Sequence, residues 1–435
     1  MSPIPSTDLE LGINQALGKV PLKFLIYDFG LSTEHVVRLA RDGGIVRYFT
    51  PYVKAFPQFE DFAPGLGLEG IEKSENFFED VDWADVIMFP DIGAGDLCDY
   101  LKRKGYLVYG AGLRGENLEN HRFETRKLQK ELGLPTQGTV PLAGIQKVRE
   151  FLQSSTAKNK TGWYIKLDKF RGDIESFYAK NYESVETILD DIEVALGPFK
   201  EAYLFIAEEK IEGIEPGFDL FFNGTEFLQP YLWGYEYHSG YIGVYTKELP
   251  EPLRFVAQKL APYLQNIDYR GAISVEMIIT ETGKPYVIDI TARFPYPLSA
   301  VYTESINNYS QVIHNIALGN KIDLDVNCKY VGCLPLESGY ADKHWLKLNF
   351  DPKLRNRIKL RMGAAIGNKF YAVKGFSNVV VLISLGNAVN EIKKELLALI
   401  KQVEAHGLEQ EEIAGGFYKI EKIIQEGTKY GLNFN

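Results

Sequence analysis

The chain has 435 residues, of which 45% are hydrophobic and 24% are charged, and its formal net charge is -10. This length predicts about three domains, and no apolar run approaches the roughly 18 residues that a membrane span needs. The acidic balance argues against duplex nucleic acid as the main partner, although a nucleotide needs only a local basic site. The start of the chain lacks the basic and apolar regions of a signal peptide, so we expect a cytoplasmic protein.

The first part of the chain alternates short apolar runs with helical patterns. Strand-length runs cover residues 23–30, 45–49, 84–90 and 106–109, and helical segments follow Ser32, a candidate cap, and span 96–104. This alternation predicts a parallel sheet with helices on both faces. Asp28–Gly30 and Asp91–Gly95 lie where ligands of such sheets bind, but neither matches a dinucleotide fingerprint, so turns are the simpler interpretation.

A basic helix is predicted next, from about His121 to Leu132, and Gly133 and Pro135 end it. It carries Arg122 and Arg126 one turn apart on one face. Such a pair usually marks a solvated face, and phosphate binding is the alternative. The strand Trp163–Leu167 then contains Lys166, which stands out because a lysine is rarely buried without a partner.

The middle of the chain reads as antiparallel sheet with helices. A strand over 202–211 runs into a Gly- and Pro-bearing segment, Asn223-Gly224 predicts a hairpin, and residues 253–264 form an amphipathic helix. Further along, residues 378–384 form a strand, and 387–406 a helix that Gly407 closes.

The most informative stretch is a hairpin between Arg270 and Phe294. With Thr282 and Gly283 as the central turn residues, Glu276 lies directly opposite Asp289, and Ser274 opposite Thr291. Two opposed carboxylates repel each other unless a proton or a cation lies between them, and Mg²⁺ held by carboxylates and nucleotide phosphates suits this arrangement. A solvated hairpin face or another register is the alternative.

The order of these motifs resembles the ATP-grasp superfamily, and within it glycinamide ribonucleotide synthetase (phosphoribosylamine–glycine ligase), over the whole length. The elements are the basic helix ending in Gly-Leu-Pro, the strand lysine, the segment Glu208–Glu215, and a Glu strand followed by an Asp-x-Thr-x-Arg strand. The resemblance implies an α/β and α+β multidomain protein. Its N-terminal open parallel α/β domain would span 1–118, an ATP-grasp domain with antiparallel sheets 119–320 with a lid at about 136–210, and a small C-terminal α+β domain 321–435.

The resemblance also implies roles for single residues. Lys166 and Arg122 would contact nucleotide phosphates, and Lys166 and Arg293 would act in catalysis at the transferred phosphoryl group. The remaining positions are Glu208, Glu209, Lys210 and Ile211 at the adenine hinge, Glu215 at the ribose, and Glu276, Asp289 and Thr291 at the metal.

The chain departs from the family pattern at several places. Thr291 stands where relatives usually have an asparagine ligand, and its hydroxyl is a poorer oxygen ligand for a second metal. The segment after Lys166 is more charged than the usual lid, and residues 237–245 replace a glycine-rich segment. Fold and nucleotide chemistry therefore transfer better than substrate identity.

The function expected from this resemblance is an ATP-dependent carboxylate–amine ligase acting through an acyl phosphate, in purine biosynthesis or a related ligation. It would use ATP and Mg²⁺, with Mn²⁺ as a substitute. Its substrates would be glycine or another amino acid and phosphoribosylamine or another nucleotide-like amine, and a homodimer is the default assembly. The alternative is a catalytically altered, ATP-binding regulatory protein. No side-chain nucleophile is required, and His238, one of only six histidines, is more readily structural than a base.

Overall fold

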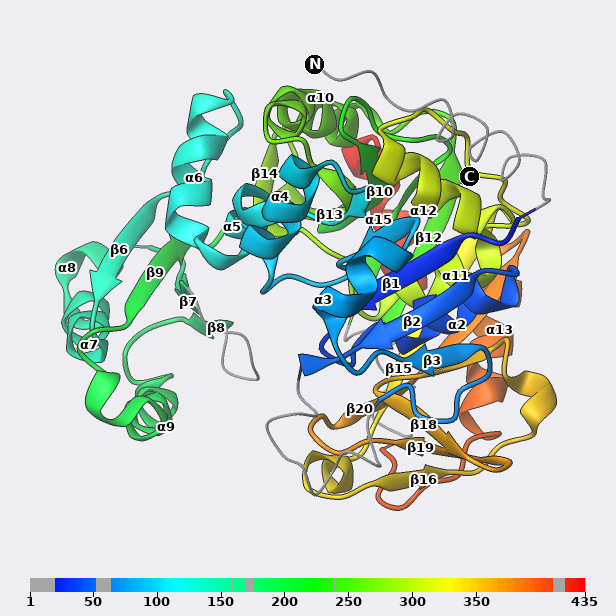
Figure 1. Ribbon diagram of the computed structural model, residues 1–435. Helices are drawn as coiled ribbons and strands as arrows, with labels where there is room; N and C mark the ends of the chain where they lie inside the picture. The colour runs from blue at the N-terminus through cyan, green and yellow to red at the C-terminus, as the bar shows by residue number, and fades with distance from the viewer. Residues whose placement is uncertain are drawn as a thin grey trace.

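The computed structural model describes residues 20–51, 64–158, 160–168, 176–237, 240–409 and 419–434. Its strands form sheets of five, four, eight and three strands, and the four-stranded sheet stands apart from the others (Figure 1). None of the helices in the described part of the chain has the length and apolar character that crossing a bilayer requires.

The N-terminal sheet is parallel, as predicted, and its strand order is β3-β2-β1-β4-β5. Its strands are β1 (Lys23–Tyr27), β2 (Ile45–Phe49), β3 (Ile71–Lys73), β4 (Val86–Met88) and β5 (Val108–Tyr109), and its helices are α2 (Thr33–Arg41), α3 (Phe77–Asp80) and α4 (Gly95–Lys104). Alternate residues of β1 face opposite sides: Phe24 packs with α2, and Leu25 packs with α3 and α4. Helices therefore cover both faces. Ser32 is the N-cap residue of α2, as predicted, but its side chain makes no cap bond, and its N–H donates to Oδ2 of Asp28 at 2.9 Å.

The four-stranded sheet, which we call the lid sheet, has the antiparallel order β6-β9-β7-β8. It consists of β6 (Thr139–Ala143), β7 (Trp163–Leu167), β8 (Ser176–Ala179) and β9 (Leu204–Glu209), with α7 (Ile145–Gln153), α8 (Ser155–Lys158) and α9 (Glu186–Leu196). The helices and one sheet face share a small core that includes Ile165 and Leu189. The neighbours of Ile165 in β7 alternate to the other face, so Lys166 points away from this core.

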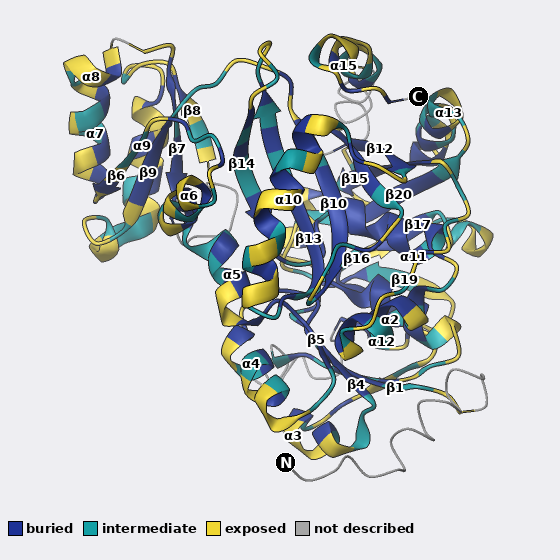
Figure 2. Cartoon of the chain, turned by 90° about the horizontal axis from the view of Figure 1, so that it is seen from above, coloured by how far each residue is buried: buried dark blue, intermediate teal, exposed yellow. Residues whose placement is uncertain are grey.

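The eight-stranded sheet forms the centre of the molecule, in the order β14-β13-β10-β11-β12-β15-β20-β17. Its strands are β10 (Pro216–Asn223), β11 (Tyr231–Tyr237), β12 (Gly240–Thr246), β13 (Arg270–Ile279), β14 (Pro285–Thr291), β15 (Tyr330–Glu337), β17 (Ile358–Leu360) and β20 (Asn378–Gly386). These strands are largely buried, whereas the outer surfaces of α7 and α8 are exposed (Figure 2). The sheet crosses the boundary expected at residue 320, and the limits 1–118, 119–320 and 321–435 stay predictions.

Helices cover both faces of the central sheet. Helix α10 (Glu251–Asn266) contributes Leu253 and Leu260 to a core with Phe218 and Val275. The opposite face packs on α11 (Tyr302–Ser305) and α12 (Tyr309–Leu318). The helices α5 (Gly112–Asn120) and α6 (Arg122–Glu131) connect the N-terminal sheet to the lid sheet.

The C-terminal elements differ in one respect from prediction. They are β16 (Leu346–Leu348), β18 (Gly363–Ile366), β19 (Lys369–Ala372), α13 (Val389–Ile400) and α15 (Ile420–Gly427). Helix α13 ends six residues before the predicted end at His406, because Glu404 pairs with Asn349 in extended conformation. Short 3-10 helices complete the fold: Val81–Trp83, Gly197–Phe199, Leu298–Val301, Gly339–Asp342, Pro352–Leu354 and Thr428–Tyr430.

Candidate active site

The hairpin of β13 and β14 brings two carboxyl groups together as predicted: Glu276 pairs with Asp289, and Ser274 with Thr291. The predicted two-residue turn was wrong. Ile279 pairs with Pro285, and Thr280 donates its N–H to Lys284 at 3.1 Å, so the connection is one residue longer. A bulge then leaves one extra residue, Ile288, in β14 and restores the expected pairing.

Antiparallel partners lie on the same face of a sheet, so the neighbouring strands add to this site. Gly217 of β10 pairs with both Glu276 and Gly234 of β11, while Asp219 pairs with Ser274. The two glycines leave the middle of this face without side chains. A Cβ placed on Gly217 would lie 3.6 Å from Cγ of Glu276, at ordinary contact distance, so a side chain here would fill part of the hollow.

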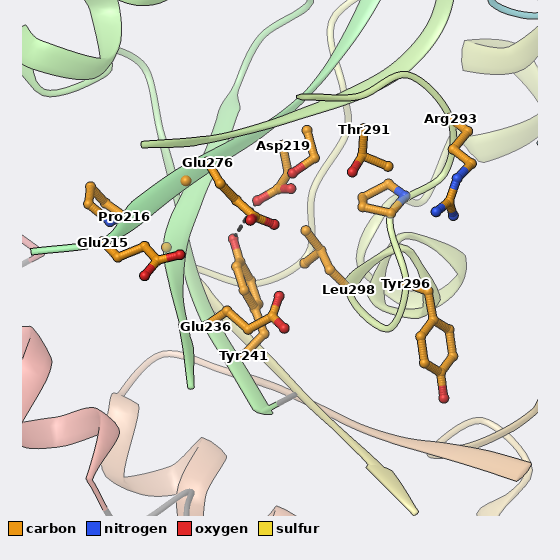
Figure 3. A pocket seen from close by; sticks show the side chains of 14 residues that line it. Glu215, Pro216, Asp219, Glu236, Tyr241, Glu276, Thr291, Arg293, Tyr296 and Leu298 are labelled. Atoms are coloured by element: carbon orange, nitrogen blue, oxygen red, sulfur yellow. Dashed lines mark hydrogen bonds between the residues drawn. The ribbon is translucent and has the colours of Figure 1, made fainter. Parts of the chain in front are cut away.

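A cavity of about 330 Å³ occupies this hollow. Glu215, Asp219, Glu236 and Glu276 line it and point toward one another (Figure 3), and we call it the acidic cavity. Arg293 is the one cation among the described residues of its lining. Its Nε lies 3.1 Å from Glu119 and 3.3 Å from Asp91, so two further carboxylates already face its charge.

The ionised forms of the acids in this cavity are unfavourable. Burial raises the pKa of Asp219 to about 7, although hydrogen bonds from Ser274 and Tyr241 act against the shift. Burial also raises the pKa of Glu276 well above its ordinary value, and the negative charges of Glu236 and Asp289 add to the effect. Partial desolvation by the cavity walls and then the charge of Asp219 raise the pKa of Glu236, although this residue stays exposed to solvent. These groups require protons or cations, as the opposed acids of the hairpin suggested.

A different arrangement surrounds Glu208 in β9, which we call the lid joint. Arg126 of α6 forms a two-point ion pair with the Glu208 carboxylate, and Nζ of Lys166 lies 3.3 Å from Oε2 of the same group. Burial alone would raise the pKa of Glu208, but Arg126 and Lys166 outweigh it and lower this pKa to about 2.

The same two cations connect the lid sheet to the hairpin of β13 and β14. Lys166 donates to the carbonyl oxygen of Ile288 at 3.0 Å, and Arg126 donates to the carbonyl oxygens of Val287 and Ile288. The bulge thus presents its backbone to both. Arg122 donates to the carbonyl oxygen of Leu167 at 3.0 Å and lies 3.4 Å from Oδ2 of Asp289.

The helix face of Arg122 and Arg126 is therefore not solvated, which was the first interpretation of this pair. Both residues are buried, at 8% and 6% exposure. They bridge α6, the lid sheet and β14, so this face points into the interior of the site.

The expected adenine hinge lies at the end of β9. Glu208 and Glu209 belong to the strand, and Glu209 also pairs with Lys160 at 2.8 Å. The Lys210 N–H donates to the carbonyl oxygen of Gly162 at 3.1 Å, so Ile211 is the first residue beyond the ladder. The nucleotide roles of these residues stay predictions. His238 and residues 169–175, part of the predicted lid, lie outside the described residues.

Three comparisons place this arrangement among known proteins. No family model matches the chain. Over 237 residues it is 24% identical to the phosphoribosylamine–glycine ligase of Nostoc sp., a match that covers 50% of this chain and 54% of that protein. The chain thus matches about half the length of this curated relative.

Two solved structures share the fold over most of both chains. The phosphoribosylamine–glycine ligase of Thermotoga maritima matches with a TM-score of 0.64 and 17% identity, covering 89% of this chain and 98% of that one. The fold is that of the ATP-grasp enzymes. The biotin carboxylase domain of Hydrogenobacter thermophilus 2-oxoglutarate carboxylase, in complex with MgADP and bicarbonate, matches with a TM-score of 0.63 and 14% identity, covering 89% and 91%.

Within this ATP-grasp fold, sequence reasoning missed two acids of the cavity, Asp219 and Glu236. Asp219 had a visible signal, because it is the single charge in the apolar run Phe218–Phe222. Glu236 had none, since a glutamate between two tyrosines fits an ordinary half-exposed strand. The Asp28–Gly30 loop is closed by its own contacts, in which Asp28 accepts from the N–H groups of Gly30 and Ser32.

Proposed function

We propose that this chain is an ATP-dependent carboxylate–amine ligase that acts through an acyl phosphate. The observation that carries the proposal is the position of Glu276 opposite Asp289, at the bulge where Lys166 and Arg122 reach β14. Two carboxylates for a metal and two cations for phosphates then lie on adjacent elements. This is the donor set that phosphoryl transfer needs.

The carboxylates fit Mg²⁺ in a particular way. Among the described residues, no three acid, imidazole or thiol side chains form a ready-made metal cage. A pair such as Glu276 and Asp289 suits Mg²⁺, which usually keeps one or two carboxylates and completes its octahedron with phosphates and water. Thr291 lies on the same face and offers a hydroxyl as a weaker ligand. Mn²⁺ would substitute.

The chain's own residues would position the reactants. Lys166 and Arg122 would bind phosphate oxygens after giving up part of their present contacts with Glu208 and Asp289. Arg293, fixed by Glu119 and Asp91, would orient the carboxylate substrate at the edge of the cavity. Bound Mg²⁺ would supply neutralisation of charge on the transferred phosphoryl group. The lid sheet, which reaches β14 through Lys166, would exclude water from an acyl phosphate.

The substrates are the finer part of the proposal. The names of the Nostoc and Thermotoga proteins support glycine and phosphoribosylamine, and hence purine biosynthesis, as one pair to test. Another amino acid and another amine are the alternative, and the acidic cavity bears on that choice. A homodimer and a cytoplasmic location stay predictions.

A second candidate is a regulatory protein that binds ATP without turnover. It is favoured by the ion pairs of Lys166 with Glu208 and of Arg122 with Asp289, because both phosphate-binding cations already have anionic partners. Thr291 at the position of a family asparagine points the same way.

The test is release of ADP from Mg–ATP in the presence of hydroxylamine and each of a panel of amino acids. Hydroxylamine intercepts an acyl phosphate whatever the natural amine is, so a ligase forms a hydroxamate that depends on one carboxylate. Asp289→Asn should abolish this product, whereas Glu248→Gln, a change at an exposed site, should not. Binding of Mg–ATP without hydroxamate from any carboxylate would replace the ligase by the regulatory protein.

A further inference from the structure

The acidic cavity holds more negative charge than the proposed metal pair explains. Glu276 is the one member of that pair that lines it, whereas Asp219 of β10 and Glu236 of β11 have no role in the ligase scheme. Asp219 is only 4% exposed, and its Oδ2 accepts a hydrogen bond from the Tyr241 hydroxyl at 3.0 Å. Asp219 is therefore fixed in place and aimed at the cavity (Figure 3).

The positive charge near the cavity is already engaged. Arg293 lies between Glu119 and Asp91, and Arg361 lies behind the wall, with its guanidinium 3.5 Å from the ring centre of Tyr296. A divalent cation at Glu276 and Asp289 would leave Asp219 and Glu236 uncompensated. A phosphate group in this half of the cavity would meet anions without a free cation among the described lining residues.

The opposite side of the cavity carries apolar surface. Leu298 and the ring of Tyr296 lie across from Glu215 and Glu236 (Figure 3), on the same side as Thr291 and Arg293, and Pro295 also belongs to the lining. Its volume, about 330 Å³, lies at the small end of ligand pockets. Such a cavity has room for a short hydrocarbon chain with positive ends, and the charge of its lining, rather than its volume, disfavours a phosphoribosyl group.

From this geometry we propose that Asp219 and Glu236 bind the acceptor amine, and that the acceptor is a phosphate-free alkylamine with at least two basic nitrogens. The proposal rests on the ligase function and names its substrate class. It departs from phosphoribosylamine, whose phosphate would lie against these acids.

The amine would react in a balanced sequence. The ammonium group gives one proton to Glu236, which is open to the cavity, while Asp219 holds the second ammonium. The amine nitrogen then attacks the acyl carbon of the acyl phosphate. A C–N bond forms, the C–O bond to phosphate breaks with its electron pair leaving on phosphate, and the released phosphate takes the second nitrogen proton.

Binding can be tested without turnover by titration calorimetry on the full chain saturated with Mg²⁺ and ADP. We expect 1,4-diaminobutane to bind and O-phosphoethanolamine, an amine of similar length with a phosphate, not to bind. Glu236→Gln and Asp219→Asn should each weaken diamine binding at least tenfold. Glu248→Gln, which removes a carboxylate exposed at the surface, should leave it within twofold.

The outcomes separate this proposal from the ligase proposal. Unchanged diamine binding in both variants, or tighter binding of O-phosphoethanolamine, would overturn the amine site. Displacement of the diamine by excess Mg²⁺ or Mn²⁺ would also overturn it, because these acids would then hold a further metal. Since Asp219 is buried, binding to Asp219→Asn is interpreted only if this variant melts at the wild-type temperature. If it does not, the result for Glu236→Gln decides the test. Hydroxamate formation tests the ligase function separately, because hydroxylamine needs no amine site.

Discussion

The lid joint and the acidic cavity each contain an enclosed glutamate, but the surroundings of the two carboxyl groups differ in charge. Glu208 is buried, yet Arg126 and Lys166 compensate its charge and lower its pKa to about 2. Glu276 is also surrounded by protein, but its nearest charged neighbours are other acids, and its pKa is raised well above the ordinary value. A buried acid with two cations completes a structure, whereas a buried acid among acids needs a ligand.

The two sites meet at one short segment of β14. The carbonyl oxygen of Ile288, the bulged residue, accepts from Lys166 and Arg126, and the next residue, Asp289, pairs with Glu276 in the proposed metal site. Binding of a nucleotide that attracts Lys166 would therefore change the joint and the metal pair together. The following predictions break one site at a time, from the largest expected effect to the smallest.

Removing the Glu208 charge should cause the largest loss of stability. Glu208→Gln leaves Arg126 and Lys166 facing an amide, and breaking a buried ion pair in this way costs about 3–5 kcal/mol. Denaturant unfolding of the metal-free protein measures the difference. Glu209→Gln, the neighbour with a partly exposed pair to Lys160, is the matched control and should cost less than about 1 kcal/mol. An equal loss of unfolding free energy in the two variants would contradict the stabilising role of the Glu208 ion pairs.

The joint should also set the acid stability of the protein. The pKa of Glu208 is lowered from 4.5 to about 2 in the folded state. The unfolded chain therefore binds this proton first as the pH falls, so the stabilisation is complete above about pH 4.5 and is lost toward pH 2. The lost part is about 3 kcal/mol. Wild-type and Glu208→Gln unfolding curves should converge across this window, and parallel curves would contradict the assignment.

The acidic cavity should respond with the opposite sign. Because the pKa of Glu276 is raised by burial and by Glu236, its ionisation destabilises the metal-free fold as the pH rises above the unfolded value. Glu276→Gln should then raise metal-free stability at pH 8, and should lose the stabilisation that Mg²⁺ gives wild type. Thermal melts with and without Mg²⁺ measure both. A destabilised variant would place Glu276 with the structural acids.

The smallest effect is expected at Thr291. Thr291→Asn supplies an amide oxygen at the position that pairs with Ser274 next to the metal pair. We expect Mg²⁺ affinity in the presence of ADP to rise a few-fold, by less than about 1 kcal/mol, because one weak ligand is replaced by a better one. Calorimetry with Mg²⁺ as titrant gives this affinity. Thr303→Asn is unsuitable as a control, because Thr303 is fully buried. Weaker binding would show that Thr291 does not face the metal.

Sequence reasoning identified the parts of this molecule that depend on local pattern. The parallel N-terminal sheet followed from alternating strand and helix patterns, and the strand containing Lys166 from its apolar neighbours. The pairing of Glu276 with Asp289 was also right, although only because a longer turn and the bulge at Ile288 offset each other. Neither the longer turn nor the bulge has a local sequence signal that fixes its position.

The features that were missed depend on contacts between distant segments. The burial of Arg122 and Arg126 arises from the lid sheet and β14 closing over α6, and helical spacing alone carries no information on that packing. Glu236 became a cavity residue only because Gly234 and Gly217 leave the neighbouring positions empty. Such cavities are lined by paired residues of several neighbouring strands. The local sequence pattern of one strand does not indicate these neighbours.

The most direct test of the central claim is the metal dependence of ADP binding in wild type and Asp289→Asn. If Glu276 and Asp289 hold the cation that links nucleotide to protein, Mg²⁺ should tighten ADP binding to wild type at least tenfold and should have little effect on Asp289→Asn, whose metal-free ADP affinity stays near that of wild type. An undiminished Mg²⁺ effect in the variant would show that the metal binds elsewhere and would contradict the account.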